Sequence, residues 1–66
     1  MRLYIVSYRF FITTYKTIVI AKNKQIALNL GYEKLQKHIR FETLKKKYID
    51  IEFCCNADKE YVGEVF

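Results

Sequence analysis

Residues 2–21 alternate between inward-facing and outward-facing positions in a way that predicts two β-strands joined by a turn. The segment is rich in β-branched and aromatic side chains, which favour strands. It is too long for one strand of a small domain, so we place a turn at Ile12-Thr13. Phe10 then faces Tyr15, and Tyr8 faces Thr17. This register gathers one face without charge, made of Tyr4, Val6, Tyr8, Phe10, Tyr15, Thr17, Val19 and Ala21.

The length of the turn decides which side chains face inward. An odd-length loop would mix the two faces and bury Arg9 or Lys16, so we expect a loop of two or four residues. Arg9 and Lys16 then lie opposite one another on the outer face. No Asn-Gly or similar turn signal occurs at this point of the chain.

Apolar residues recur at helical spacing after Asn23, which is a favourable N-cap for a helix from about Lys24 to about Ile39. Gly31 in mid-helix costs about 1 kcal/mol relative to alanine, so we expect a close approach of helix and sheet there. We interpret His38 as a partly buried packing residue. The arc expected to lie on the hairpin comprises Ala27, Leu28, Gly31, Tyr32, Leu35, His38 and Ile39.

Strict alternation returns between Tyr48 and Cys55 and predicts a third strand. Ile49, Ile51, Phe53 and Cys55 are expected on its buried face, and Cys54 as an exposed thiol. A turn at residues 56–59 and a short strand from Tyr61 to Phe66 follow. The predicted fold is a single α+β domain over residues 1–66. Its antiparallel sheet has three to four strands in the order ββαβ or ββαββ, with one helix packed on one face.

A single helix covers only one face of the predicted sheet. On the other face Leu3, Ile5, Ile18 and Ile20 form an apolar cluster, with Arg9, Lys16 and Lys22 around it. Such clusters usually mark a contact surface. Residues 41–47 of this chain, a second copy or another protein could cover it. The candidate residues for binding a partner or forming a dimer, which include a smaller stripe on the helix, are Leu3, Ile5, Arg9, Phe11, Lys16, Ile18, Ile20, Ile26 and Leu30.

The charge distribution keeps a nucleic-acid partner open. The net charge is +5, but basic residues dominate positions 1–49 whereas residues 50–66 are acidic. An acidic strand beside a basic hairpin would neutralise much of this field. The aromatic side chains would form a stacking surface only if the hairpin register slipped by one residue.

No residue pattern in the chain indicates an enzyme, a metal site or a cofactor. His38 is the single histidine, Cys54 and Cys55 are adjacent rather than spaced as metal ligands, and no glycine-rich phosphate loop occurs. Arg9 and Lys16 interrupt the apolar run of the first segment, so we expect neither a signal peptide nor a membrane span. We therefore expect a cytoplasmic protein with reduced thiols.

The stretch TIVIAKNKQIAL, residues 17–28, combines a strand ending in V-x-A, an Asn cap and an alanine-containing helix. With the hairpin before it and the strand after it, over about residues 3–55, this pattern resembles very short phage-encoded accessory proteins. Small anti-CRISPR and other anti-defence inhibitors are among them. The resemblance implies a protein that occupies the working surface of a host protein, and it carries over no functional residue. We expect a non-enzymatic binding module that docks on a partner protein and forms a homo-oligomer, which we expect to be a dimer. The alternative is a small basic nucleic-acid-binding protein that uses the basic and aromatic hairpin.

Overall fold

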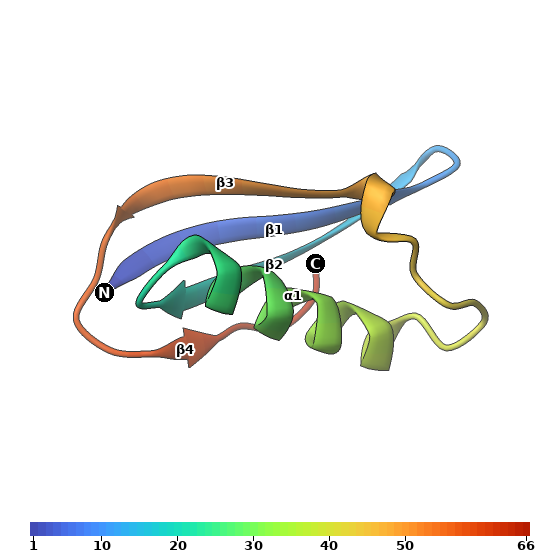
Figure 1. The fold of residues 1–66 in the computed structure, drawn as a ribbon. Helices are drawn as coiled ribbons and strands as arrows, with labels where there is room; N and C mark the ends of the chain where they lie inside the picture. The colour runs from blue at the N-terminus through green and yellow to red at the C-terminus, as the bar shows by residue number, and fades with distance from the viewer.

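The computed structural model describes residues 1–66, whose four strands form one antiparallel sheet in the order β3-β1-β2-β4. One long helix, α1, lies along one face of this sheet (Figure 1). The predicted α+β class and the ββαββ order are therefore confirmed. The elements are β1 (Arg2–Phe10), β2 (Thr13–Ala21), α1 (Lys24–His38), the 3₁₀ helix η1 (Lys46–Tyr48), β3 (Ile49–Asn56) and β4 (Tyr61–Val62).

The β1–β2 hairpin has the predicted parity but a different register. Its loop is the two-residue turn Phe11-Ile12, so Tyr8 lies opposite Tyr15 instead of Thr17. The pairing differs from the predicted one by two residues, and an even shift leaves every side chain on its predicted face. The inward side chains that are fully buried are Tyr4, Val6, Tyr8, Thr17, Val19 and Ala21.

The register also separates the two basic residues that we expected to oppose one another. Arg9 lies opposite Thr14, and Lys16 lies opposite Ser7. Arg9 and Lys16 are therefore diagonal neighbours on the outer face, and the predicted direct pairing is wrong. The reason is the position of the turn, which no glycine or asparagine marks in the sequence.

Phe11 occupies the turn rather than the outer face of β1, where the sequence had placed it. Its φ of 55° lies in the left-handed region and is the one positive φ in the chain. A positive φ at the first central residue alone is the pattern of a type II′ turn, where glycine is usual. The twist of the strands favours this turn although a bulky residue in that conformation costs about 1–2 kcal/mol.

Helix α1 begins at the predicted cap. The Oδ1 atom of Asn23 accepts a hydrogen bond from the Ile26 N–H at 2.9 Å, and the helix ends at His38. Ala27, Gly31 and Leu35 are buried against the sheet. A Cβ atom at Gly31 would lie 2.7 Å from the Val6 side chain, so the predicted close approach is confirmed.

His38 is exposed, which contradicts the predicted partial burial. It lies at the last residue of the helix, where the chain turns away from the sheet. Its ring lies 5.6 Å from that of Tyr15, centroid to centroid.

The connection between α1 and β3 packs on the same face of the sheet as the helix. Leu44 is buried in the core, and its carbonyl accepts a hydrogen bond from the Tyr32 hydroxyl at 3.0 Å. The Tyr8 hydroxyl donates to Glu42 at 2.9 Å, and the Gln36 amide bonds to both Glu42 and Leu44. Residues 41–47 therefore do not cover the outer face.

A β-bulge in β3 overturns one prediction. Leu3 pairs with Cys55 and Tyr4 pairs with Phe53, which leaves Cys54 as the extra residue. Beyond the bulge the alternation is reversed, so Cys55 joins the outer face and is exposed. The predicted burial of Cys55 is wrong for this reason. Phe53 stays on the helix side, where its ring lies 5.8 Å from that of Tyr4, but it is 52% exposed, so its predicted burial is also wrong. Phe53 belongs to the edge strand, where neither a further strand nor the helix covers it.

Candidate protein-binding surface

The face of the sheet turned away from α1, here called the outer face, carries no helix or connecting segment. The strand registers arrange its side chains in three rows that run across the strands. Cys55, Leu3, Ile20 and Tyr61 form the first row; Glu52, Ile5 and Ile18 the second; and Asp50, Ser7, Lys16 and Phe66 the third.

The centre of the outer face is the predicted apolar cluster. Leu3 pairs directly with Ile20, and Ile5 pairs with Ile18, so the four side chains are contiguous. Each of them is half-buried because its neighbours on the flat sheet cover its flanks. The structure therefore brings together the four apolar residues that the alternation of the hairpin had singled out.

Two aromatic residues extend the cluster along the β4 side. Tyr61 lies opposite Ile20 and is 55% exposed. Phe66 exchanges two backbone hydrogen bonds with Lys16 and is 64% exposed. Sequence analysis missed both, because it offered no means to decide that the C-terminal segment lies along β2.

We predicted a basic rim around the cluster, but only part of the rim is basic. Asp50 and Glu52 project from β3 beside Ser7 and Ile5, so one flank of the outer face is acidic. Arg9 and Lys16 lie toward the hairpin turn, and both are exposed. The difference arises because the acidic strand is the neighbour of β1, which only the folded sheet determines.

Three of the predicted binding residues lie away from the outer face. Phe11 is in the turn, while Ile26 and Leu30 lie on α1. Ile26 is 37% exposed, whereas Leu30 packs against the core next to β4. The smaller helix stripe therefore does not join the apolar cluster.

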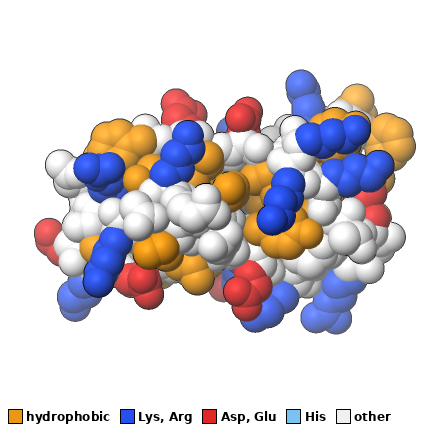
Figure 2. All heavy atoms as spheres, viewed as in Figure 1, with side chains coloured by type: hydrophobic (Ala, Val, Ile, Leu, Met, Phe, Trp, Pro, Cys, Tyr) orange, Lys and Arg blue, Asp and Glu red, His pale blue; other side chains and the backbone are white.

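A second exposed surface surrounds the hairpin turn, and we call it the tip patch. It contains Phe11, which is 83% exposed, and Phe41, which is 64% exposed, with Phe10 between them at ring distances of 4.5 and 5.2 Å. The Nζ atom of Lys47 lies 5.0 Å from the ring centroid of Tyr48. Figure 2 shows basic and hydrophobic side chains gathered at the end of the molecule where Figure 1 places this turn. The tip patch comprises Arg9, Phe10, Phe11, Phe41, Lys45, Lys47 and Tyr48.

Beside the turn, part of the tip patch forms a hollow of about 460 Å³. Its wall includes Tyr8 and Glu42, whose side chains are hydrogen-bonded at 2.9 Å. Burial, and then the bond to Glu42, raise the pKa of the Tyr8 phenol. Tyr8 therefore stays protonated at neutral pH and holds the residue 39–45 connection against the sheet.

The two thiols lie on the exposed edge strand. A hydrogen bond in which the Cys54 thiol donates to the adjacent Cys55 side chain favours the protonated form and raises the pKa of Cys54 above its ordinary value. A raised pKa lowers the thiolate fraction, which is the opposite of what a nucleophilic or metal-binding cysteine requires. Cys54 therefore does not have the lowered pKa of an activated thiol.

Comparison with protein-family models, with curated proteins and with solved structures yields no match to this chain. No helix in the structure combines the length and the apolar character needed to cross a membrane.

Proposed function

We propose that this chain is a non-enzymatic binding module that self-associates through the outer face and docks on a partner protein. The supporting observation is the contiguous cluster of Leu3, Ile5, Ile18 and Ile20, on a sheet face that no other element of the chain covers. A small domain buries only about 60% of the surface of its unfolded chain. Burial of a second sheet face against another molecule therefore adds a large share of its stability.

The charge pattern of the outer face suits a second copy of the same chain. Asp50 and Glu52 lie on one flank, and Lys16 lies on the other side of the cluster. A two-fold axis parallel to the strands places the acidic flank of each copy over the β2–β4 side of the other, near Lys16. Such an isologous interface uses one patch twice and closes as a dimer.

The decisive variant is Ile18→Glu, which puts a charge in the middle of the cluster. Wild-type protein should sediment as a dimer at micromolar concentrations, and the variant as a monomer of 8.0 kDa with an unchanged circular dichroism spectrum. Ile26→Glu makes the same chemical change at an exposed helix position and should leave the dimer intact. A wild-type monomer, or an Ile18→Glu chain that unfolds, would contradict the proposal.

The resemblance to phage accessory proteins leads us to propose a host protein as the partner. Cys54 and Cys55 are free and exposed, as expected for a chain that works in a reducing, cytoplasmic compartment. Affinity capture with the wild type, Ile18→Glu and Ile26→Glu variants would show whether the outer face also recognises this partner.

The tip patch supports a second candidate function, which is binding of single-stranded nucleic acid. Tyr4 and Tyr8 are buried, so the stacking surface cannot be built from them. Phe11 and Phe41 are exposed instead, beside Arg9 and Lys45. Aromatic rings with nearby cations are the elements that bind single strands. Phe11 keeps an unfavourable backbone conformation, which is common at functional sites.

The variant Phe11→Gly separates this function from stability. Glycine adopts a positive φ without strain, so the variant should unfold at a higher temperature, by about 1 kcal/mol of added stability. Loss of the ring should weaken binding of a single-stranded oligonucleotide by about tenfold or more. Tyr61→Ala removes an exposed aromatic residue outside the tip patch and should not weaken oligonucleotide binding. If the oligonucleotide does not bind, or if Phe11→Gly does not weaken its binding across a salt series, the nucleic-acid function is contradicted. Only the protein-binding function then remains.

A further inference from the structure

Strand β3 forms one edge of the sheet. It pairs with β1 on one side and has no neighbouring strand on the other. Backbone N–H and C=O groups in an antiparallel sheet alternate between the two neighbours. Lys16 and Ile18 bond outward to the C-terminal segment, so the other β2 residues, Thr17 and Val19, bond to β1. The same alternation leaves Leu3, Ile5 and Ser7 of β1 to bond to β3.

The alternation therefore identifies the free groups of the edge. Ile5 pairs with Glu52 and Ser7 pairs with Asp50, so these two β3 residues turn their backbone groups toward β1. The N–H and C=O groups of Ile51 and Phe53 and the C=O of Ile49 point away from the sheet, whereas the Ile49 N–H bonds to the Lys46 carbonyl. An unpaired row of this kind is a template for another strand.

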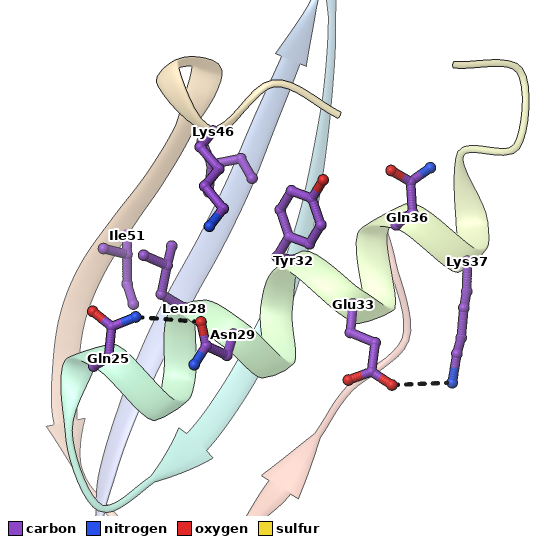
Figure 3. Close-up of a pocket in the computed structure, with 10 residues that line it drawn as sticks. Gln25, Leu28, Asn29, Tyr32, Glu33, Gln36, Lys37, Lys46 and Ile51 are labelled. Carbon is purple, nitrogen blue, oxygen red and sulfur yellow. Dashed lines mark hydrogen bonds and ion pairs between the residues drawn. The ribbon is translucent and has the colours of Figure 1, made fainter. Parts of the chain in front are cut away.

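A groove lies next to this edge, between β3 and α1. It has a volume of about 590 Å³ and four hydrophobic lining residues, Leu28, Tyr32, Ile49 and Ile51. Figure 3 shows Leu28 from the helix and Ile51 from the strand pointing into the space between the two elements. Polar side chains rim the groove, among them Gln25 and Lys46. The groove exists because α1 packs over β1 and β2 and leaves the helix side of β3 partly open.

The two sides of β3 would demand different side chains from an added strand. Ile49 and Ile51 point to the groove side and are half-buried against the core, so the residues opposite them should be apolar. Asp50 and Glu52 point to the outer face and are exposed, so the residues opposite them should be basic. Opposite charges directly across a strand pair are favourable, and like charges are not.

We infer that the β3 edge and the α1–β3 groove bind an extended segment of a partner protein in which basic and apolar residues alternate. The segment adds a fifth strand to the sheet, with its apolar side chains in the groove and its basic side chains facing Asp50 and Glu52. An edge strand beside a helix-lined groove is the arrangement used for peptide recognition by strand addition. This inference rests on the proposed binding function and specifies the chemistry of its partner.

A second copy of the chain is disfavoured at this edge in the symmetric pairing centred on Ile51. In the two-fold pairing centred on Ile51, Asp50 of each copy would face Glu52 of the other. Like charges directly opposed are destabilising. The edge therefore favours a basic partner, and this partner and the proposed dimer share Asp50 and Glu52.

The test uses a synthetic, end-blocked peptide of alternating lysine and valine, with binding measured by titration calorimetry. We expect the peptide to bind and to protect the Ile51 and Phe53 amides from hydrogen exchange. A peptide of the same composition with its lysines and valines in separate blocks should bind at least about tenfold more weakly. A third peptide, with N-methyl groups on its valines, whose N–H groups would face Ile51 and Phe53, cannot pair with the edge and should not bind.

Charge exchange makes the assignment specific to β3. The double variant Asp50→Lys, Glu52→Lys should lose about tenfold in affinity for the lysine–valine peptide and bind a glutamate–valine peptide instead. The double variant Asp58→Lys, Glu60→Lys has the same net charge, but its new lysines lie outside β3. It should keep the wild-type preference.

Each unfavourable result points to a different failure. Equal binding of the alternating and block peptides, or equal effects of the two charge-reversed variants, would show nonspecific attraction and overturn the inference. Binding weaker than about 1 mM would also overturn it. The Ile18→Glu monomer should bind the peptide at least as tightly as the wild type does, because its Asp50 and Glu52 are not shared with a second copy. If the wild type is a monomer but binds the peptide, the proposed dimer fails and the edge site stands. If the wild type is a dimer but does not bind the peptide, the edge site fails and the outer face stands.

Discussion

At the scale of single residues, Gly31 shows why a residue that is poor for a helix is kept in the middle of one. The Cβ atom of any other residue would lie 2.7 Å from the Cβ and both Cγ atoms of Val6. Val6 is fully buried and β-branched, so it cannot rotate away. The missing side chain at Gly31 therefore sets the distance between α1 and β1.

The substitution Gly31→Ala should destabilise the protein although alanine is the better helix former. We expect an overpacking cost of about 1–3 kcal/mol, which exceeds the gain of about 1 kcal/mol in helix propensity. Urea unfolding would measure the difference. In a Val6→Ala background the same substitution should cost less, because two of the three obstructing atoms of Val6, its Cγ methyl groups, are gone and only the Cβ remains. An unchanged cost in that background would show that the Val6 methyl groups are not the cause.

Single residues also show where the alternating pattern of apolar and polar positions fails to predict burial. Asn23 and Gly31 are explained by local chemistry that the sequence displays. Cys55 is not, because one unpaired residue at Cys54 reverses every later position of the strand. The position of the bulge depends on how β3 pairs with β1, and the sequence of β3 alone does not indicate that pairing.

At the scale of elements, the connection from residue 39 to residue 45 behaves as part of the core. Ile39 and Leu44 are fully or almost fully buried, and Glu42 accepts a hydrogen bond from Tyr8 of β1. Gln36 of α1 bonds to the carbonyls of Ile39 and Glu42 and to the Leu44 N–H. These bonds satisfy the polar groups of a segment that has no regular structure.

The Tyr8–Glu42 bond predicts a specific dependence of stability on pH. Burial and Glu42 hold the pKa of Tyr8 above its ordinary value, so the folded state keeps the phenol proton more strongly than the unfolded state. This contribution is complete below the ordinary tyrosine pKa of about 10, and is lost as pH rises from there through the higher pKa of the folded state.

The matching variant is Tyr8→Phe, which keeps the ring and removes the hydroxyl. At neutral pH it should be less stable than the wild type by about 1–2 kcal/mol, because the hydrogen bond is lost. The difference should shrink as the pH is raised beyond about 10, since only the wild type then loses stability through this group. Urea unfolding across the alkaline range measures both. Tyr61→Phe, at an exposed position, should follow the wild-type curve, and a constant difference for Tyr8→Phe would contradict the assignment.

At the scale of the whole molecule, the sheet offers two surfaces to other molecules for different physical reasons. The outer face presents apolar side chains, and the β3 edge presents unpaired backbone groups beside a groove. A second copy satisfies the first, and an extended basic and apolar segment satisfies the second. The two surfaces share only Asp50 and Glu52, so both can be occupied when the dimer leaves these carboxylates accessible.

Self-association through the outer face has a thermodynamic signature beyond sedimentation. If folding and dimerisation are coupled, the melting temperature of the wild type should rise with protein concentration. The Ile18→Glu monomer should melt at a lower temperature that does not depend on concentration. A wild-type melting temperature independent of concentration would contradict the proposed dimer.

The sequence by itself determined the local elements and the parity of the hairpin. Period-two and helical patterns, the Asn23 cap and Gly31 specify which side chains face inward, because burial of apolar surface acts on each segment separately. These signals also placed Leu3, Ile5, Ile18 and Ile20 together on one face.

Only the tertiary structure decided which strands are neighbours, where the turn and the bulge lie, and what surrounds the apolar cluster. In the folded chain the acidic strand β3 lies beside β1, the C-terminal segment lies along β2, and the β3 edge is free next to a groove. Pairing between distant strands depends on backbone geometry and on the closure of the whole sheet, and no local stretch of residues encodes either.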